Sequence, residues 1–459
     1  MQKLWIKIGN LSLKLTDKYS ENKKNRMILI LFSVYILLFL AFDSIRVFGI
    51  DISNAARAII DCCILFPIIV FSIKDPLKKV KNNTISIAWL ICGGLILITA
   101  IDHPIGFSTI ASGVAMLTVF PFLFLVWKNR GDYETLFKLY SQAYVWVILL
   151  CAILCLIFAP LGQNEMYGLR YMGITANPNY LALFVLPGFV CGLYLYITSK
   201  KRGIVPLFAC GAAFALTFFT MFRTSLIAMI LQLALVMLIM AKEFYLNNKD
   251  KRRIIIKKML LLAFTLMLSI PIVYGGLTYG NTAIWKALKT CFNIELPAVT
   301  NQTTLEERTI ILDKEFKMQE GADYSNLRIT IWKEYLKRIN IRGNDVTKSF
   351  YIPGFGENTS AHNDFLEYTY RSGIIVGMLY LFIAIYAGVK LLQYVFGNGR
   401  QRKYLLFFAL MVTGFCVVSM LGNTHYILSG ALTFSYCMSL VSIFFTEKNV
   451  EICSIKEYN

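Results

Sequence analysis

Three histidines carry the side chain best suited to proton transfer near neutral pH: His103, His362 and His425. Each lies at or beside the end of an apolar run, where a membrane helix would meet water. An unperturbed imidazole titrates at about pH 6.5, so any of them could act as a general base. His362 has the most informative surroundings, because it follows a glycine-containing turn and precedes Asn363 and Asp364, either of which could cap the next helix.

Three arginines could bind an anionic group near such a base: Arg170 in YGLRYMG, Arg223 in FFTMFRTSL and Arg328 in NLRITIW. A guanidinium group can donate two parallel hydrogen bonds to the oxygens of one phosphate, and it stays charged near neutral pH. Arginine is costly within a membrane span, so Arg223, between two apolar runs, is expected either to bind an anion or to satisfy carbonyl groups at a tight helical hairpin. Three arginines beside a histidine would suit a phosphate or diphosphate carried on a lipid.

The elements that must position these side chains are apolar helices. The chain has 459 residues, is 57% apolar and has a mean hydropathy of +0.59. Spanning a bilayer takes roughly 20 apolar residues as a helix, and a helix satisfies its own backbone groups in lipid. We therefore predict an all-α, polytopic integral membrane protein with about 12 transmembrane helices. The expected spans are 27–42, 52–72, 84–101, 108–127, 140–160, 179–198, 204–221, 224–241, 259–276, 365–389, 404–421 and 427–446.

The positive charge of the chain follows this topology. With a cytoplasmic N-terminus, the segments assigned to the cytoplasm contain 30 of the 46 Lys and Arg residues, as the positive-inside rule requires. The net charge of +19 is therefore a topological signal, and we expect no nucleic-acid partner. The same topology predicts that the three arginines and the histidines lie on the extracytoplasmic side of a cytoplasmic (inner) membrane.

The organisation expected from these features has three parts. Residues 1–276 hold the cytoplasmic N-terminus and nine transmembrane helices, residues 277–364 form one large extracytoplasmic loop with amphipathic helices, and residues 365–459 hold three more helices and a cytoplasmic tail. Within the loop, RITIWKEYLKRI has apolar residues at helical spacing. The sequence contains no zinc-type ligand cluster, Walker loop or serine-nucleophile elbow, so we expect no metal and no cofactor.

The segment GFGENTSAHNDFLEYTYRSGIIVG resembles the signature of the O-antigen ligase and Wzy-type polysaccharide polymerase superfamily. In that signature, His-Asn is followed after nine residues by Gly at the start of a membrane helix, which here gives His362, Asn363 and Gly373. The closing small residue is displaced, with Val376 at the expected position and Gly377 just after it. The number of spans, the large late loop, an Asn-Pro-Asn-Tyr-Leu-Ala segment, the arginine after the seventh span and an Arg-x-x-x-Trp in the loop agree with the resemblance.

The resemblance implies a fold similar to membrane-class (GT-C-like) glycosyltransferases and a metal-independent transfer of glycan from undecaprenyl diphosphate. Carried over by residue, His362 matches the proposed base, and Arg223 and Arg328 match arginines thought to hold the donor diphosphate. Glu367 matches an acidic residue common in the motif, although it could equally be a satisfied helix carboxylate. Arg170 is a candidate on charge and position alone.

Three functions stay open at this point. A polymerase would join lipid-linked repeat units of an O-antigen, capsule or exopolysaccharide, whereas a ligase would move the glycan to lipid A core or to a protein. A polysaccharide-related transporter or flippase is a further alternative, for which Arg57 and Asp61 in the second expected span are the main support. For the enzyme, the expected partners are the lipid-linked donor, a glycan or lipid acceptor, membrane lipids, a chain-length regulator and a flippase.

Overall fold

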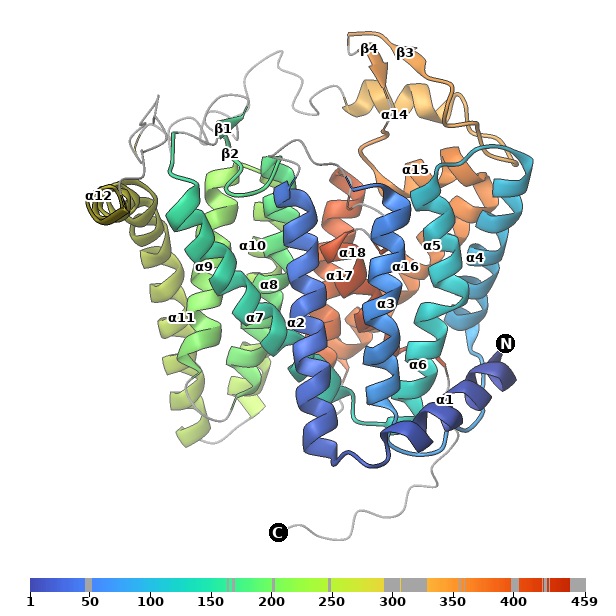
Figure 1. The fold of residues 1–459 in the computed structure, drawn as a ribbon, viewed down its shortest axis with the longest axis horizontal. Coiled ribbons are helices and arrows are strands. Elements are labelled where there is room, and N and C mark those ends of the chain that lie inside the picture. Colours follow the sequence, from blue (N-terminus) through green and yellow to red (C-terminus); the bar gives the residue numbers. More distant parts are fainter. Residues whose placement is uncertain are drawn as a thin grey trace.

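A computed structural model shows a bundle of long helices with short helices and two small hairpins at its ends (Figure 1). It describes residues 1–45, 52–162, 165–166, 170–199, 203–246, 249–292, 306, 328–354, 356–358, 360–397, 404–422, 424, 427–428 and 430–445. The helices are α1 (Gln2–Thr16), α2 (Glu21–Ile45), α3 (Asn54–Ser72), α4 (Thr84–Asp102), α5 (Phe107–Leu117), α6 (Val119–Arg130), α7 (Tyr133–Phe158), α8 (Pro178–Thr198), α9 (Ile204–Thr220), α10 (Arg223–Leu246), α11 (Lys249–Gly275), α12 (Asn281–Phe292), α14 (Arg328–Leu336), α15 (Asp364–Ser372), α16 (Ile374–Phe396), α17 (Tyr404–Leu421) and α18 (Ala431–Ser439). The antiparallel hairpins pair β1 (Glu165–Met166) with β2 (Arg170–Tyr171) and β3 (Phe350–Ile352) with β4 (Gly356–Asn358).

The apolar runs form helices, as expected for a polytopic membrane protein. Among the described residues, ten helices are long and apolar enough to cross a membrane. They correspond to ten of the twelve expected spans. The other two, 204–221 and 427–446, correspond to shorter apolar helices, which are α9 and α18 with its 3₁₀ extension Leu440–Ser442.

One expected span is divided. The span expected at 365–389 is two helices, because the chain turns at Gly373 between α15 and α16. After α11 ends at Gly275, a π-helical turn, Gly276–Gly280, leads into α12. Apart from Gly276, both fall within the loop expected at 277–364, whose polar stretch at 301–326 lies outside the described residues except for Glu306.

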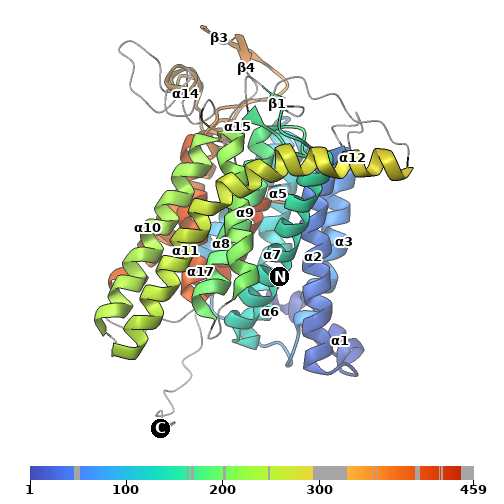
Figure 2. The ribbon, with the colours of Figure 1, turned by 90° about the vertical axis from the view of Figure 1, so that its left-hand side faces the viewer.

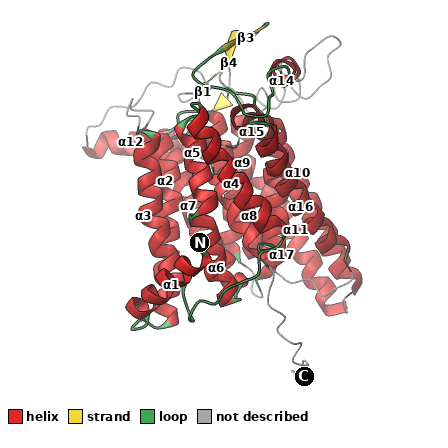
Figure 3. Cartoon of the chain, turned by 90° about the vertical axis from the view of Figure 1, so that its right-hand side faces the viewer, coloured by secondary structure: helices red, strands yellow, loops and turns green. Residues whose placement is uncertain are grey.

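The two ends of the bundle differ. One end carries α14, α15, β3 and β4, and α12 lies across the helix ends on this side (Figures 1 and 2). The opposite end carries α1 and the connectors that hold most of the lysines and arginines (Figures 1 and 3). In the interior, α8 is the most enclosed spanning helix, with 89% of its apolar window buried.

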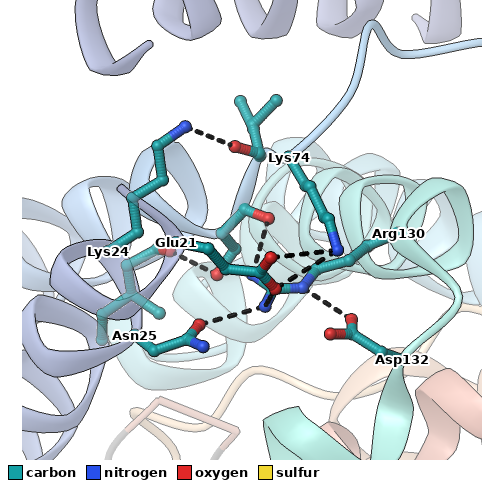
Figure 4. Close-up of polar contacts among 9 residues, drawn as sticks. Glu21, Lys24, Asn25, Lys74, Arg130 and Asp132 are labelled. Carbon is teal, nitrogen blue, oxygen red and sulfur yellow. Dashed lines mark hydrogen bonds and ion pairs between the residues drawn. The ribbon is translucent and has the colours of Figure 1, made fainter. Parts of the chain in front are cut away.

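A polar cluster fixes the end that carries α1 (Figure 4). The Arg130 side chain is only 2% exposed and contacts Asp132 at 2.6 Å and Glu21 at 3.3 Å. Lys74 also contacts Glu21, at 3.1 Å, and Lys24 donates to the carbonyl oxygen of Ile73 at 3.2 Å. These contacts tie the start of α2 to the α3–α4 connector and to the end of α6.

Candidate active site

His362 has a backbone conformation that few side-chain-bearing residues adopt. Its φ is +49°, in the left-handed region. Such a conformation costs free energy and persists only where the surroundings impose it, and it is common at functional sites. Here the neighbouring Ala361 is held on both sides, since its N–H donates to Glu367 Oε2 at 2.6 Å and its carbonyl accepts from Trp332 Nε1 at 3.0 Å.

The helix that follows His362 is capped by Asn363. The Asn363 side-chain oxygen accepts from the N–H of Leu366 at 3.0 Å, which confirms the capping reading of this residue. The same side chain donates through Nδ2 to the carbonyl of Met420 at 2.9 Å. Asn363 thus fixes the start of α15 against the end of α17.

Asp364 does not cap the helix but forms a buried contact that the sequence did not reveal. Its carboxylate accepts from the N–H of Thr424 at 3.2 and 3.3 Å and from the Thr424 hydroxyl. Burial raises the pKa of Asp364 to about 7, against the opposing effect of the hydrogen bonds from Thr424. Because the two residues are 60 positions apart, no local pattern could have paired them.

Glu367 positions the backbone at His362. One carboxylate oxygen holds the Ala361 N–H, and the other contacts Arg371 Nε at 2.5 Å in an i,i+4 ion pair. Arg371 in turn donates to the carbonyl of Ile105 at 3.4 Å, which connects α15 to the α4–α5 turn. These contacts give Glu367 a structural role beside the base, whatever else it does in a reaction.

The loop helix α14 is held over α15 by a small hydrophobic core of its own. Tyr335 of α14 contacts Tyr370 of α15 and Phe350 of β3, with ring centroids 4.8 and 5.1 Å apart. Ile331 lies one turn before Tyr335 in the same cluster and is also buried. The helix expected from RITIWKEYLKRI is confirmed as α14, and this core places Arg328, at its first turn, near His362.

Arg223 lies near enough to Arg328, and Arg328 near enough to His362, for their charges to interact. Burial lowers the pKa of Arg328, and the positive charge of Arg223 lowers it further. Burial likewise lowers the pKa of His362, with a second contribution from the charge of Arg328, while Glu367 acts in the opposite direction. The charge of Arg223 disfavours the charged form of Arg328, and an anion bound beside Arg328 would offset this effect.

The turn between α9 and α10 presents Arg223, and Arg170 supports that turn. Met221 has a φ of +52°, and the N–H of Phe222 is held by Thr220 Oγ1 at 3.2 Å. Arg170 Nε donates to the carbonyl of Thr220 at 3.1 Å, and its Nη2 contacts Asn179 Oδ1 at 2.5 Å. Arg170 therefore joins β2 and the start of α8 to the turn, and a role in binding an anion stays a prediction.

Gly373 is required at the joint between α15 and α16. Its φ of +90° is accessible to few other residues. A Cβ atom there would lie 2.1 Å from the carbonyl oxygen of Ile341. Gly377, one turn along α16, packs against α15, since a Cβ there would lie 1.8 Å from Thr369 Oγ1. Gly377, the displaced small residue of the sequence signature, is thus the position at which α15 and α16 pack closely. Val376, at the expected position of that residue, is buried elsewhere in the bundle.

An apolar groove of about 320 Å³ lies next to His362 on the outside of the bundle. Trp332 and Leu336 of α14, Phe365 of α15, and Met378 and Leu381 of α16 line it, together with Asn363. Met378 is 56% exposed, so the groove opens on the flank of a spanning helix.

Of the other two histidines, the structure describes His103 alone. His103 caps the end of α4, with Nε2 3.4 Å from the carbonyl oxygen of Arg371 and Nδ1 3.7 Å from Asp102. His425 lies outside the described residues. Within the described part of the chain, no group of three or more His, Cys, Asp or Glu residues is arranged to hold a metal ion.

The charged residues of the second expected span form a separate feature in α3. Arg57 lies 3.9 Å from Asp43 of α2, and its guanidinium lies over the ring of Phe42, 4.9 Å from the centroid. Asp61 is 1% exposed and has one carboxylate oxygen without a hydrogen-bond partner. A cavity of about 20 Å³ adjoins it, between α3 and Ser108 of α5.

No protein-family model matches this chain, and comparison with curated proteins and with solved structures gives no match.

Proposed function

We propose that the protein is a metal-independent, lipid-donor glycosyltransferase that transfers or polymerises undecaprenyl-diphosphate-linked oligosaccharide repeat units. The reaction would take place at the outer face of the cytoplasmic membrane, in the synthesis of a surface polysaccharide. The observation that carries the proposal is the electrostatic contact of Arg223 with Arg328 and of Arg328 with the strained His362, whose neighbour Asn363 lines an apolar groove. An anionic head group and a long hydrocarbon chain on one substrate would use both features.

In the proposed step, an acceptor sugar hydroxyl attacks the anomeric carbon of the donor. The new glycosidic bond forms as the bond from that carbon to the diphosphate oxygen breaks, and undecaprenyl diphosphate leaves. His362 takes the hydroxyl proton, a contribution of about 10²–10⁴-fold for one general base. Arg223 and Arg328 stabilise the negative charge that develops on the diphosphate, which is where preorganised charge contributes most.

The low pKa of His362 supports the role of base. A base must be neutral to accept a proton, and both burial and the Arg328 charge favour the neutral imidazole. Burial of the same side chain by a bound substrate would act in the same direction.

The test is a pair of histidine substitutions in the full-length protein. His362→Ala is expected to abolish glycan transfer while leaving the amount of membrane-inserted protein unchanged. His103→Ala is the matched control, because His103 caps α4 and contacts the backbone at Arg371, and it is expected to retain transfer. Full activity of His362→Ala would overturn the proposed base.

Polymerase and ligase share this chemistry, and we favour the polymerase because no acceptor-specific feature is readable in the loop. Analysis of lipid-linked glycans in a deletion strain separates the two. Loss of a polymerase leaves single repeat units on the carrier lipid, whereas loss of a ligase leaves long polymers there.

A transporter is the second candidate, and Asp61 is the observation that favours it. Charged residues inside spans are costly and commonly mark transport pathways, and one oxygen of this buried carboxylate has no partner. Purified protein in liposomes distinguishes the two functions. Glycan transfer without translocation supports the enzyme, and translocation without transfer supports the carrier.

A further inference from the structure

Helix α1 lies across the end of the bundle that is opposite to α14 and α15 (Figures 1 and 3), in contact with α3 and α6. Its buried face consists of Trp5, Gly9, Ser12 and Thr16. The Trp5 ring stacks on Phe122 of α6, with centroids 6.5 Å apart. This face accounts for how α1 is held, and it leaves two other faces to be explained.

The second face is an apolar stripe that the bundle does not cover. Leu4, Leu11 and Leu15 are 58%, 63% and 68% exposed. Their spacing of seven and four residues places them on one side of the helix. Three exposed leucines on one side of a helix indicate an apolar environment on that side.

The third face is basic. Lys7 and Lys14 follow Leu4 and Leu11 by three residues, so the two stripes run side by side. Lys3 lies one turn before Lys7, the three lysines are exposed, and α1 contains no acidic residue before its C-cap, Asp17. A helix with one apolar stripe and an adjoining lysine stripe has the pattern of a helix that lies in a membrane interface.

We propose that α1 is a binding surface for anionic phospholipids in the leaflet at this end of the bundle. The leucine stripe inserts among the acyl chains and the lysines contact the phosphate groups. The buried face keeps α1 against α3 and α6, so the lipid head groups meet the basic connectors of the same end. This inference is independent of the proposed enzymatic function.

The charge pattern favours a lipid surface over a protein partner. A protein would have to cover an apolar stripe and, beside it, offer acidic side chains to three exposed lysines along the helix. An anionic bilayer supplies both environments at once, with about 1 kcal/mol of attraction for each lysine near the surface. A second copy of the chain or another protein is therefore treated as an outcome of the test.

The test places a photo-crosslinking amino acid, p-benzoylphenylalanine, at position 11 of the full-length chain. The protein is reconstituted in vesicles of phosphatidylcholine with a known fraction of phosphatidylglycerol, and the crosslinked products are identified by mass. Phosphatidylglycerol adducts are expected to exceed its mole fraction about fivefold, the ratio that corresponds to one lysine contact of about 1 kcal/mol. Substitution of Lys3, Lys7 and Lys14 by Gln is expected to reduce this excess to the mole fraction.

The matched control carries the same crosslinker at Phe264 of α11, which is 59% exposed within a spanning helix and has no charged residue within one turn. Its adducts are expected to follow the bulk lipid composition. Adducts at position 11 that also follow the bulk composition would overturn the proposal, as would protein adducts in place of lipid. An excess that survives the three lysine substitutions would also contradict it.

Discussion

At the scale of single residues, the site is built by holding the backbone around His362. Ala361 is fixed through both its N–H and its carbonyl, Asn363 caps the following helix, and Asp364 is buried against Thr424. The imidazole itself is left half-buried beside Arg328. Positioning of this kind, in which neighbours rather than the base make the structural contacts, is what a preorganised catalytic group requires.

The first residue-scale prediction concerns pH. If His362 is the proposed base, it works only when neutral, so activity should be present above its pKa and should be lost as the pH falls through it. Because burial and Arg328 lower that pKa from 6.5, the acidic limb of kcat/KM is expected below pH 6.5. Arg328→Gln removes one of the two causes, so the limb should shift to higher pH, apart from any loss in rate.

The control for this shift is Lys333→Gln, which removes an exposed cation from the same helix. Its pH profile is expected to match that of the unmodified protein. The measurement is kcat/KM for glycan transfer across the acidic range. An acidic limb that does not move in Arg328→Gln would show that this charge does not act on the base.

The second residue-scale prediction separates the charge of Glu367 from its hydrogen bond. Glu367→Gln retains an oxygen for the N–H of Ala361 but loses the ion pair with Arg371, whereas Glu367→Ala loses both. A buried N–H left without an acceptor costs about 1–3 kcal/mol. The midpoint of thermal unfolding in detergent should therefore fall further for Ala than for Gln. Equal midpoints for the two variants would mean that the hydrogen bond to Ala361 contributes nothing measurable.

At the scale of elements, the joint between α15 and α16 decides where the site lies. The turn at Gly373 directs α15 across α16, and the crossing is close because Gly377 has no side chain. The same crossing gives the groove its floor. A continuous helix from 365 to 389, as expected from the apolar run, would have no such joint.

The prediction at this scale compares two glycines. Gly373→Ala adds a Cβ at a φ of +90° and 2.1 Å from a backbone oxygen, so a loss of at least about 2 kcal/mol in the free energy of unfolding is expected. Gly388→Ala, within α16, meets no atom within 4 Å and should be neutral or stabilising by up to about 1 kcal/mol. Thermal unfolding of the two purified variants gives the comparison. A Gly373→Ala protein as stable as Gly388→Ala would contradict the described joint.

At the scale of the whole molecule, the sequence predicts the helices better than it predicts the site. Apolar runs predict spans because a single helix makes all of its backbone hydrogen bonds within itself, as lipid requires. Ten of the expected spans correspond to helices of sufficient length. The contact of Asp364 with Thr424 joins elements far apart in the chain. Only the packed bundle brings such residues together. The apolar run did not predict the break at Gly373, because apolar residues follow it without interruption and a single glycine is compatible with a continuous helix. Only the family resemblance placed Gly373 at the start of a membrane helix.

The candidate residues themselves were also predictable from local sequence, whereas their spatial grouping was not. The candidate residues lie at the starts of three helices: His362 just before α15, Arg223 at the first residue of α10 and Arg328 at the first residue of α14. Each was singled out by its residue type and by its place near a helix end. Their electrostatic coupling depends on α14 folding back over α15, which the amphipathic pattern of α14 only suggests. The supporting roles of Arg170 and Glu367 in holding backbone groups were not readable from the sequence.

The orientation of the whole molecule yields the last prediction. Cys291 is exposed on α12, which lies at the same end of the bundle as α14 and α15 (Figure 2). Cys62 and Cys63 are also exposed, but they lie within the spanning helix α3. If the site faces the extracytoplasmic side, a membrane-impermeant maleimide added to intact cells should label Cys291, and Cys291→Ser should abolish the signal. Labelling that appears only in inside-out vesicles would place His362 and both arginines in the cytoplasm, and an undecaprenyl-linked donor already carried across the membrane could not then reach them.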